Sequence, residues 1–273
     1  MKHPSNSTAG ATPADGVQAI RRALELARQV AQLQRSGATL ARISKATGLN
    51  RSTAFRILRS LTDERLLHFR QSDRTYHVGP LAFELGLAGG AYADLREQWR
   101  DTIAAIAATT GFTSYLMARS GDEAVCLLCI QGSAAVRAMP IDVGQRVPLG
   151  IGAGGLVMLA ALDDDEIRRI AHSHQERLDM FPSRRLSVEQ IEARVRATRQ
   201  RGYSVSAGTV ANGVAGIGVL VPGLPPHLQL AATVSMVTDQ ISDEEAKSVS
   251  RVLFNSLRMF AAPVRVSFLD DLC

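Results

Sequence analysis

The 273-residue sequence has few cysteines, few aromatic residues and no long apolar run. Three cysteines are a sparse, odd-numbered set, which excludes a disulfide framework. The longest apolar run, residues 156–162, is far shorter than the ~20 residues needed to cross a bilayer. Residues 1–16 lack the apolar segment of a signal peptide. We therefore expect a cytoplasmic chain that does not enter a membrane and begins with a disordered tail over residues 1–16.

The sequence also lacks a recognisable set of catalytic or metal-binding side chains. No nucleophile is paired with a base, and no two acids stand at a catalytic spacing. Cys126 and Cys129 form a C-x-x-C pattern within an apolar run that predicts a strand, where residues three apart point to opposite faces. Because a zinc or redox site there needs a second pair of ligands nearby, we assign no metal, no cofactor and no catalytic residue.

Positive charge is concentrated in the N-terminal third of the chain. The formal net charge is +5. Residues 1–90 contain 13 Lys and Arg against 6 Asp and Glu, whereas residues 91–273 contain slightly more acidic than basic residues. Basicity confined to one small region is the electrostatic pattern expected of a domain that binds a polyanion such as nucleic acid.

Residues 39–61 show two short helical patterns joined by a turn. Thr39 and Asn50 are residue types that cap helix N-termini, and Gly48 between them favours the left-handed conformation that ends a helix. The second helix is predicted to bury one face, formed by Ala54, Ile57, Leu58 and Leu61. Two helices joined in this way are typical of a helix-turn-helix that binds DNA.

The face of the second helix opposite these apolar residues is expected to be exposed and to enter the DNA groove. A rotation of ~100° per residue places polar and basic side chains on it. Together with the capping residue of the preceding helix, the predicted DNA contacts are Thr39, Arg51, Ser52, Thr53, Phe55, Arg56 and Arg59.

Flanking segments complete a predicted winged helix-turn-helix over residues 17–79. A helix over residues 17–34 is expected to cover it through an apolar stripe of Val17, Ile20, Leu24, Ala27 and Ala31. Strand-like runs at 66–70 and 74–78 predict a β-hairpin wing, whose Arg70 and Arg74 are candidate phosphate contacts. Residues 80–94, which begin with a proline suited to a first helical turn, are predicted to form a linker helix.

The remaining residues predict a second domain over 95–263, followed by a C-terminal tail over 264–273. Helical patterns occur at 95–106, after residue 150, at 163–172, 187–201 and 242–261. Strand-like runs occur at 113–119, 124–131, 136–139, 213–221 and 228–237, and most are joined as hairpins. The predicted fold class is therefore α+β with an antiparallel sheet.

A glycine-rich segment leads into the apolar helix of this second domain. Gly150, Gly152 and Gly155 match the G-x-G-x-x-G pattern of dinucleotide-binding enzymes, but Pro148 and the hairpin-linked strands before it do not fit the required βαβ context. Two other interpretations remain open. The glycines could admit a ligand to the free amides of a helix start, which favour a carboxylate, or they could only allow close packing.

From about Val17 to Ala262 the sequence resembles the IclR family of bacterial transcription factors. The resemblance rests on four motifs in order: ATGLNRSTAFRILRSL, YHVGPLAFELG, RVPLGIGAGGLVMLA and RGYSV. It implies an N-terminal winged helix-turn-helix and a GAF-like effector domain. It also implies a homodimer or a dimer of dimers that controls a catabolic operon in response to a small molecule, often an organic or aromatic acid.

By position, the resemblance implies effector contacts at Gly152, Ala153, Gly154, Gly216, Thr233 and Ser235. The sequence departs from the family pattern at Ser206, where many members have an acidic residue, and at Gly216, where some have a cysteine. The smaller side chains leave a wider and more apolar site, which suits a larger ligand such as an aromatic acid. Asn212 is expected to add polarity to it.

We therefore expect a sequence-specific operator-binding regulator, either a repressor or an activator. A dimer would place two recognition helices in successive major grooves, and a ligand would change their spacing through the linker. Two alternatives are a dinucleotide-binding enzyme that uses residues 150–155 and a nonspecific DNA-packaging protein. Saturable NADH binding would favour the enzyme, and equal affinity for operator and random DNA would favour the packaging protein.

Overall fold

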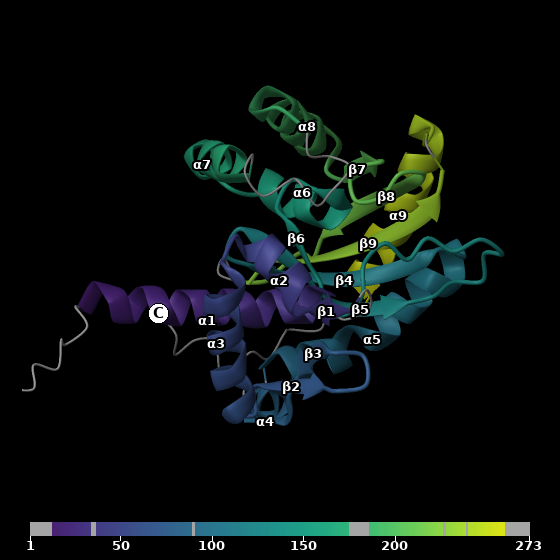
Figure 1. Cartoon of the computed structure of the whole chain (residues 1–273). Coiled ribbons are helices and arrows are strands. Elements are labelled where there is room, and N and C mark those ends of the chain that lie inside the picture. The colour runs from purple at the N-terminus through teal and green to yellow at the C-terminus, as the bar shows by residue number, and fades with distance from the viewer. Residues whose placement is uncertain are drawn as a thin grey trace, which may run out of the picture. The chain divides into compact units, whose positions relative to one another are not determined.

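The chain folds into two compact units that divide between residues 89 and 90. The computed structural model describes residues 13–33, 37–88, 91–174, 186–225, 228–238 and 240–259 (Figure 1). Residues 1–12 of the predicted N-terminal tail and all of the predicted C-terminal tail lie outside the described residues. In the part of the chain that is described, no helix is both long and apolar enough to cross a bilayer.

The N-terminal unit surrounds a small apolar core with helices and a three-stranded antiparallel sheet of order β1-β3-β2. Its elements are α1 (Pro13–Leu33), β1 (Ala38–Thr39), α2 (Leu40–Thr47), α3 (Arg51–Asp63), β2 (Leu67–Arg70), β3 (Thr75–Val78) and α4 (Pro80–Ala88). Five fully buried core residues come from the first three helices, namely Leu26, Val30, Ile43, Ala54 and Leu58, and Ala38 of β1 is fully buried with them. The helix-turn-helix and the wing therefore share one core, as the apolar pattern of α3 predicts.

The predicted buried stripe of α1 is wrong at three of its five residues, whereas Ala27 packs against the core and Ala31 is partly buried. Leu26 and Val30 pack into the core, whereas Val17, Ile20 and Leu24 are 55%, 63% and 48% exposed. Both sets repeat at helical spacing, so periodicity alone does not identify which of them faces the core. The helix also begins at Pro13, within the segment predicted as a tail.

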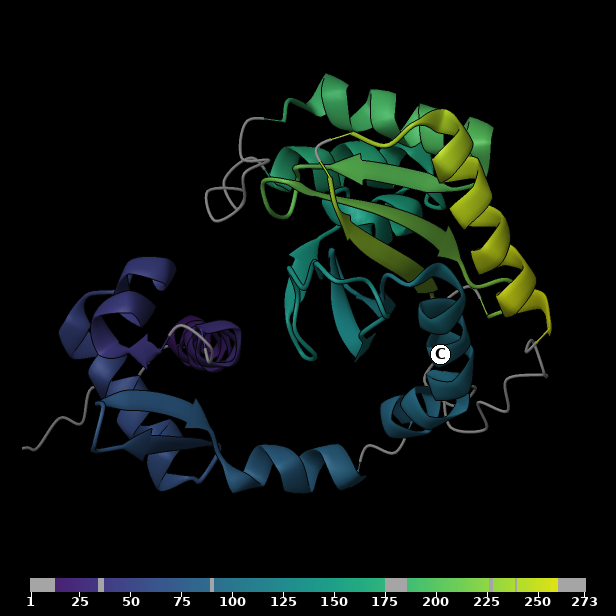
Figure 2. The same ribbon diagram turned by 90° about the vertical axis from the view of Figure 1, so that its right-hand side faces the viewer.

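The wing forms as predicted, with one additional strand. β2 and β3 pair antiparallel, with Phe69 opposite Tyr76, and β1 adds to the outer side of β3. Figure 2 shows this hairpin in blue, leading directly into α4. The helix predicted over residues 80–94 is divided, because α4 ends at Ala88 and a separate helix begins at Ala91.

The C-terminal unit is built on a six-stranded sheet of order β6-β5-β4-β9-β8-β7, and every pairing in it is antiparallel. Its helices are α5 (Ala91–Thr110), α6 (Gly152–Ala160), α7 (Asp164–His174), α8 (Val188–Arg201) and α9 (Asp243–Met259). Its strands are β4 (Thr113–Ser120), β5 (Glu123–Ile130), β6 (Arg146–Pro148), β7 (Ser204–Ala207), β8 (Val214–Leu220) and β9 (Leu230–Val237). The predicted α+β class with an antiparallel sheet is confirmed.

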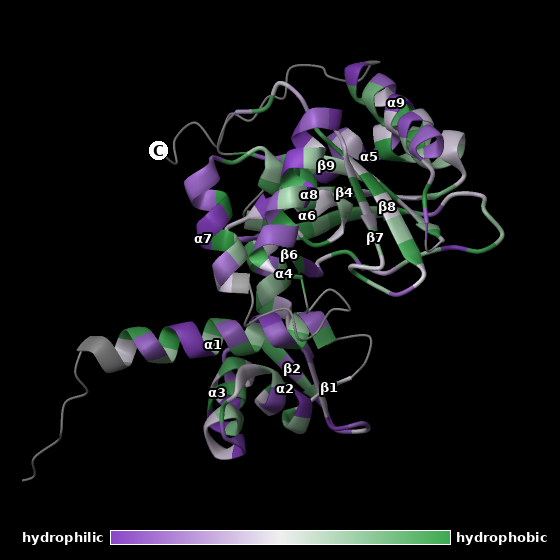
Figure 3. Ribbon diagram, turned by 90° about the horizontal axis from the view of Figure 1, so that it is seen from above, coloured by the Kyte–Doolittle hydropathy of each residue, from purple (hydrophilic) through white to green (hydrophobic). Residues whose placement is uncertain are grey.

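Helices cover both faces of this sheet. Trp99 and Ile103 of α5 and Leu253 of α9 pack on one face, and α6 packs on the other with α7 and α8 outside it. All residues of α6 are buried, whereas Figure 3 colours α7 mostly hydrophilic. The buried position of α6 explains why its sequence is apolar on every side.

Two predictions about the strands are wrong. Residues 136–139 form no strand; instead, the carbonyl of Ala138 accepts hydrogen bonds from side chains. Cys126 and Cys129 do not point to opposite faces, because β5 contains a bulge. Met117 pairs with Cys126 and Leu116 with Leu128, so Leu127 is an extra residue. Both cysteines therefore face α6.

Candidate DNA interface and effector cavity

The two helices of the predicted helix-turn-helix are fixed by their capping residues. Gly48 ends α2 in the left-handed conformation, with φ of 68°. Asn50 caps α3, and its side-chain oxygen accepts from the backbone amide of Thr53 at 2.8 Å. Thr39 caps α2 more loosely, at 3.4 Å from the amide of Arg42. These caps position the first turn of α3, which in a helix-turn-helix is the part that contacts base edges.

The outward face of α3 carries basic side chains that have few partners within the protein. Arg51 and Arg56 are exposed and make no ion pair with any described residue. Arg59 lies 3.9 Å from Asp63, but both side chains are about 70% exposed and such a pair is weak. The hydroxyl of Ser52 donates to Asn50 at 2.9 Å and so supports the cap. The guanidinium groups are therefore available to an external anion.

The two wing arginines differ in their freedom. Arg70 forms an ion pair with Asp73 at 3.2 Å and donates to Nε2 of His77, which fixes it within the hairpin. Burial and the charge of Arg70 lower the pKa of His77, so its ring is neutral at pH 7 and accepts this bond. Arg74 is exposed, makes no polar contact within the described ranges and has a φ of 56°. A non-glycine residue held in this region is strained, and Arg74 is the better candidate for a phosphate contact.

The C-terminal unit contains a cavity between the start of α6 and the sheet. Its empty space is about 470 Å³, which includes space open to solvent. Six of the seven predicted effector-binding residues line it, namely Gly152, Ala153, Gly154, Gly216, Thr233 and Ser235. Among the described residues, no charged side chain lines this cavity.

A row of small residues forms the floor of the cavity. Gly216 of β8 pairs with Ser206 of β7 on one side and with Ser235 of β9 on the other. A side-chain carbon at Gly216 would lie 3.0 Å from the carbonyl of Val234, 3.4 Å from Ala153 and 3.6 Å from the hydroxyl of Ser206. The absence of a side chain at Gly216 therefore allows Ala153 of α6 to pack closely against β8 at the floor of the cavity.

Hydroxyl groups provide most of the polarity of the cavity. The hydroxyls of Ser235 and Tyr115 both donate to the carbonyl of Ala138, at 2.7 and 3.3 Å. Burial raises the pKa of Tyr115, so its hydroxyl stays protonated and can donate. The hydroxyls of Ser206 and Thr233 have no partner within the described part of the chain, and they remain available to a ligand.

The start of α6 contributes backbone amides to the same space. Its first residue, Gly152, has a φ of 66°, and its amide donates to the hydroxyl of Thr209 at 3.1 Å. The amides of Ala153 and Gly154 belong to the first helical turn, where amides have no acceptor within the helix. A side-chain carbon at Gly154 would lie 2.9 Å from Met117. The glycine loop therefore allows close packing and also places the start of α6 in the wall of the cavity.

The prediction that Asn212 lines the cavity is wrong. Asn212 is exposed in the turn between β7 and β8 and is not among the residues that line the cavity. Val210 lines the cavity instead. Sequence reasoning also missed apolar lining residues from three other segments: Tyr115, Met117, Ile141, Val147 and Ile151. The sequence contains one signal for these residues. Tyr115 and Met117 alternate with other residues along β4, so both side chains face α6.

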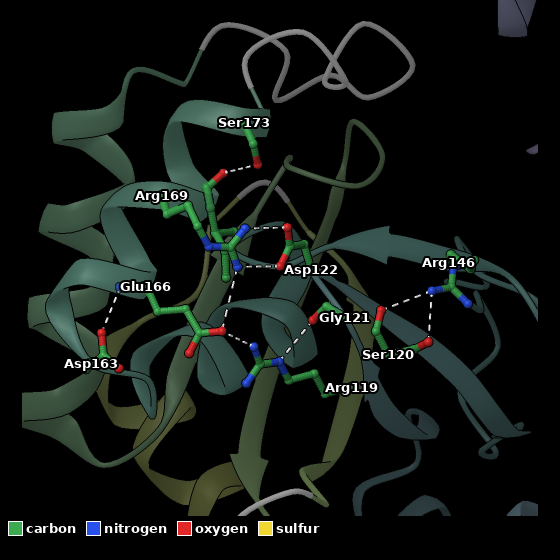
Figure 4. A network of polar contacts seen from close by, with 10 residues as sticks. Arg119, Ser120, Gly121, Asp122, Arg146, Asp163, Glu166, Arg169 and Ser173 are labelled. Atoms are coloured by element: carbon green, nitrogen blue, oxygen red, sulfur yellow. Dashed lines mark hydrogen bonds and ion pairs between the residues drawn. The ribbon is translucent and has the colours of Figure 1, made fainter. Parts of the chain in front are cut away.

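A network of ion pairs holds the entry to α6 in place (Figure 4). Arg169 of α7 binds Asp122 through two hydrogen bonds of 2.8 and 2.9 Å, and Arg119 binds Glu166 of the same helix. The carbonyl of Asp122 accepts from the amide of Leu149 at 3.0 Å. Because Leu149 directly precedes the glycine segment, α7 and the β4–β5 turn together position the rim of the cavity.

The structure does not fit the dinucleotide-binding alternative. The glycine segment follows β6, a three-residue strand that pairs antiparallel with β5, and among the described residues this sheet contains no parallel pairing of neighbouring strands. A dinucleotide fingerprint requires a βαβ unit with parallel strands.

The described ranges also contain no group of three or more side chains suited to hold a metal ion.

Comparison with known families assigns both units of the chain. Residues 19–71 match the IclR helix-turn-helix domain, and residues 91–260 match the C-terminal domain of the bacterial transcriptional regulator IclR. The chain belongs to the IclR family. This IclR-family protein is a DNA-binding transcriptional regulator with an effector domain, and the resemblance predicted from its motifs is confirmed.

Individual relatives of this IclR-family regulator are distant but match most of its length. It is 25% identical over 229 residues to the HTH-type transcriptional regulator XynR of Escherichia coli, and the match covers 84% of this chain and 90% of that protein. It is 26% identical over 218 residues to the HTH-type transcriptional regulator TtgV of Pseudomonas putida, covering 80% and 82%. The relatives therefore share both units.

Solved structures share the fold. An IclR family transcriptional regulator from Brucella abortus gives a TM-score of 0.69 at 21% identity, covering 92% of this chain and 95% of that chain. An IclR homolog from Microbacterium hydrocarbonoxydans, complexed with 4-hydroxybenzoate, gives a TM-score of 0.62 at 17% identity, covering 88% and 99%. Both structures therefore contain the same two folds, the winged helix-turn-helix and the effector domain.

Proposed function

We propose that this regulator binds a specific operator of a catabolic operon and that a small aromatic acid in the effector cavity changes its affinity for that operator. The observation that carries the proposal is the outward face of α3. It presents Arg51, Arg56 and Arg59 without strong partners on a helix whose opposite side is fixed in a core. A dimer would place two such helices in successive major grooves.

The chemistry of the cavity supports an aromatic acid as the effector. Its walls are mostly apolar, and the small residues Ser206, Gly216 and Ser235 lie side by side on its floor, which suits a planar ring. With no cationic side chain in the described lining, the amides of Ala153 and Gly154 at the start of α6 are the groups that favour a carboxylate. The 4-hydroxybenzoate in the Microbacterium relative is a ligand of this class.

A panel of matched aromatic compounds tests the effector assignment. Thermal unfolding of the full chain would be followed with benzoate, 4-hydroxybenzoate, benzamide and benzyl alcohol. A ligand that binds only the folded state adds about 2.7 kcal/mol of stability at 100 times its Kd. We expect an acid of the panel to raise the Tm more than its neutral amide and to change operator affinity. A panel in which no acid does either contradicts the assignment.

The exposed stripe of α1 supports assembly as a homodimer, which could itself pair into a dimer of dimers. Three apolar residues recur at helical spacing on its solvent face, namely Val17, Ile20 and Leu24. Each of them is about half exposed or more. A two-fold axis along such a stripe would bury the same residues from both copies. Removing apolar surface of this kind from water is favourable and would stabilise the dimer.

Ile20→Glu is therefore expected to weaken the dimer. Ile20 is 63% exposed in the chain itself, so the substitution leaves the monomer fold intact, while it places two carboxylates in the proposed interface. We expect the dimer dissociation constant to rise by roughly tenfold or more, measured by sedimentation equilibrium. Arg22→Ala, on another exposed part of α1, is the charge control, because it makes the net charge one unit more negative, as Ile20→Glu does. An unchanged dissociation constant in Ile20→Glu would place the interface elsewhere.

A further inference from the structure

Phe55 is an apolar side chain on the outward face of α3. It is 47% exposed, whereas the other large apolar residues of the helix, Ile57, Leu58 and Leu61, pack against the core of the N-terminal unit. Its ring has no aromatic neighbour among the described residues, where Phe69 and Tyr76 form a ring pair. Packing within the unit therefore does not account for a phenyl group at this position.

The position of Phe55 within the helix places it among the candidate base contacts. At ~100° per residue, Ser52, Phe55, Arg56 and Arg59 fall within an arc of roughly 100°. Phe55 is the fifth residue of α3, whose first turn is fixed by the Asn50 cap. In a helix-turn-helix, the N-terminal part of the second helix approaches the base edges of the major groove.

A phenyl ring can recognise only one kind of base edge in that groove. Guanine, adenine and cytosine present hydrogen-bond donors and acceptors there, and thymine also presents its C5 methyl group. Against a polar edge the ring would displace water without replacing its hydrogen bonds, which costs free energy. Against the thymine methyl it removes apolar surface from water on both sides.

We propose that Phe55 is a specificity-determining residue that contacts a thymine methyl group in each half of the operator. The inference rests on the proposed operator binding and adds the chemical feature that is read. It requires a thymine in each half-site that contributes through its methyl group rather than through hydrogen bonds. The neighbouring Arg56 and Arg59 supply the polar and phosphate contacts around it.

The experiment removes the methyl group from the DNA and the ring from the protein. An operator is first selected from random duplexes with the full-length protein. Each thymine is then replaced by deoxyuracil in both half-sites, and Kd is measured by fluorescence anisotropy at fixed salt. Loss of one buried methyl is expected to weaken binding about fourfold per half-site and roughly fifteenfold for both. One thymine position should show this effect.

Phe55→Ala should abolish the discrimination between thymine and uracil at that position, whereas Phe55→Leu, which keeps an apolar side chain, should retain most of it. Because Phe55 is exposed and lies outside the core, both variants should melt within a few degrees of the wild type. A cytosine at the same position should bind weakly and 5-methylcytosine should restore part of the loss, because it returns the methyl group to the groove.

Two results would overturn the inference. In one, no thymine position is sensitive to uracil; in the other, Phe55→Ala retains the full discrimination. If the protein still prefers its operator over random DNA in either case, only the role of Phe55 is wrong. If it shows no such preference, selection yields no operator and the proposed function itself fails.

Discussion

Combined replacement of Arg56 and Arg59 by alanine is expected to weaken operator binding by roughly 100-fold or more. A base or phosphate contact by an arginine typically contributes about 1 to 3 kcal/mol, and a dimer loses each contact twice. Neither arginine is needed for the fold, since Arg56 has no ion-pair partner in the described ranges and Arg59 has only the exposed Asp63. Fluorescence anisotropy with the selected operator and with random duplex measures the change.

A charge-matched control separates local contact from general electrostatics. Arg100 and Arg196 are also exposed and loosely paired, but they lie on α5 and α8 of the other unit. Their double alanine variant loses the same charge and should keep operator affinity within a few-fold. The slope of log Kd against log salt should fall only for Arg56→Ala with Arg59→Ala, because phosphate contacts release counterions. Equal affinities in the two variants would exclude α3 as the recognition helix.

Ser206→Leu is expected to abolish the response to the effector while leaving operator binding intact. Ser206 is 6% exposed, faces the cavity beside Gly216 and has no hydrogen-bond partner in the described part of the chain. The larger side chain would extend into the cavity beside Gly216 without breaking a bond within the protein. We expect ligand affinity to fall at least about 100-fold, by isothermal titration calorimetry, because overlap excludes the ring from a close-packed site.

Ser206→Ala is the matched control for this experiment. It removes only the hydroxyl, so it should reduce ligand affinity by about tenfold or less, which is the range for one hydrogen bond. The Tm of both variants shows whether the fold is retained. A Ser206→Leu protein that folds and still binds the effector as the wild type does would mean that the ligand occupies another site.

Local capping signals explain why the helix-turn-helix could be predicted from the sequence. Gly48 ends α2 and Asn50 caps α3, as expected from their residue types. The capping box of Ser187 and Gln190 forms at the start of α8 in the same way. These signals act within a few residues, so their outcome does not depend on the rest of the fold.

Features that depend on long-range pairing could not be predicted in this way. The bulge at Leu127 arises from the register of β5 against β4, and it reverses the expected orientation of Cys129 relative to Cys126. The apolar residues around Val136 form no strand, because the carbonyl of Ala138 binds Tyr115 and Ser235 from distant parts of the chain. A local pattern contains no information about these partners.

The effector cavity could be predicted only in part, because only some of its lining residues belong to a local sequence pattern. The glycine segment and the positions on β8 and β9 follow from the order of family motifs, and they do line the cavity. Val210 and Ile141 lie outside helices and strands, where no periodicity marks which side chains turn inward. Asn212 was misplaced for the same reason, because it lies in the turn between β7 and β8, where Val210 and not Asn212 lines the cavity.

The most direct test of the account is the Kd of the full-length protein for its selected operator, measured with and without a saturating effector from the aromatic panel. Coupling between ligand and operator binding predicts a change of about 5- to 150-fold, and the Ser206→Leu variant should show none. An operator Kd that stays the same at saturating effector, or that equals the Kd for random duplex, would contradict the account.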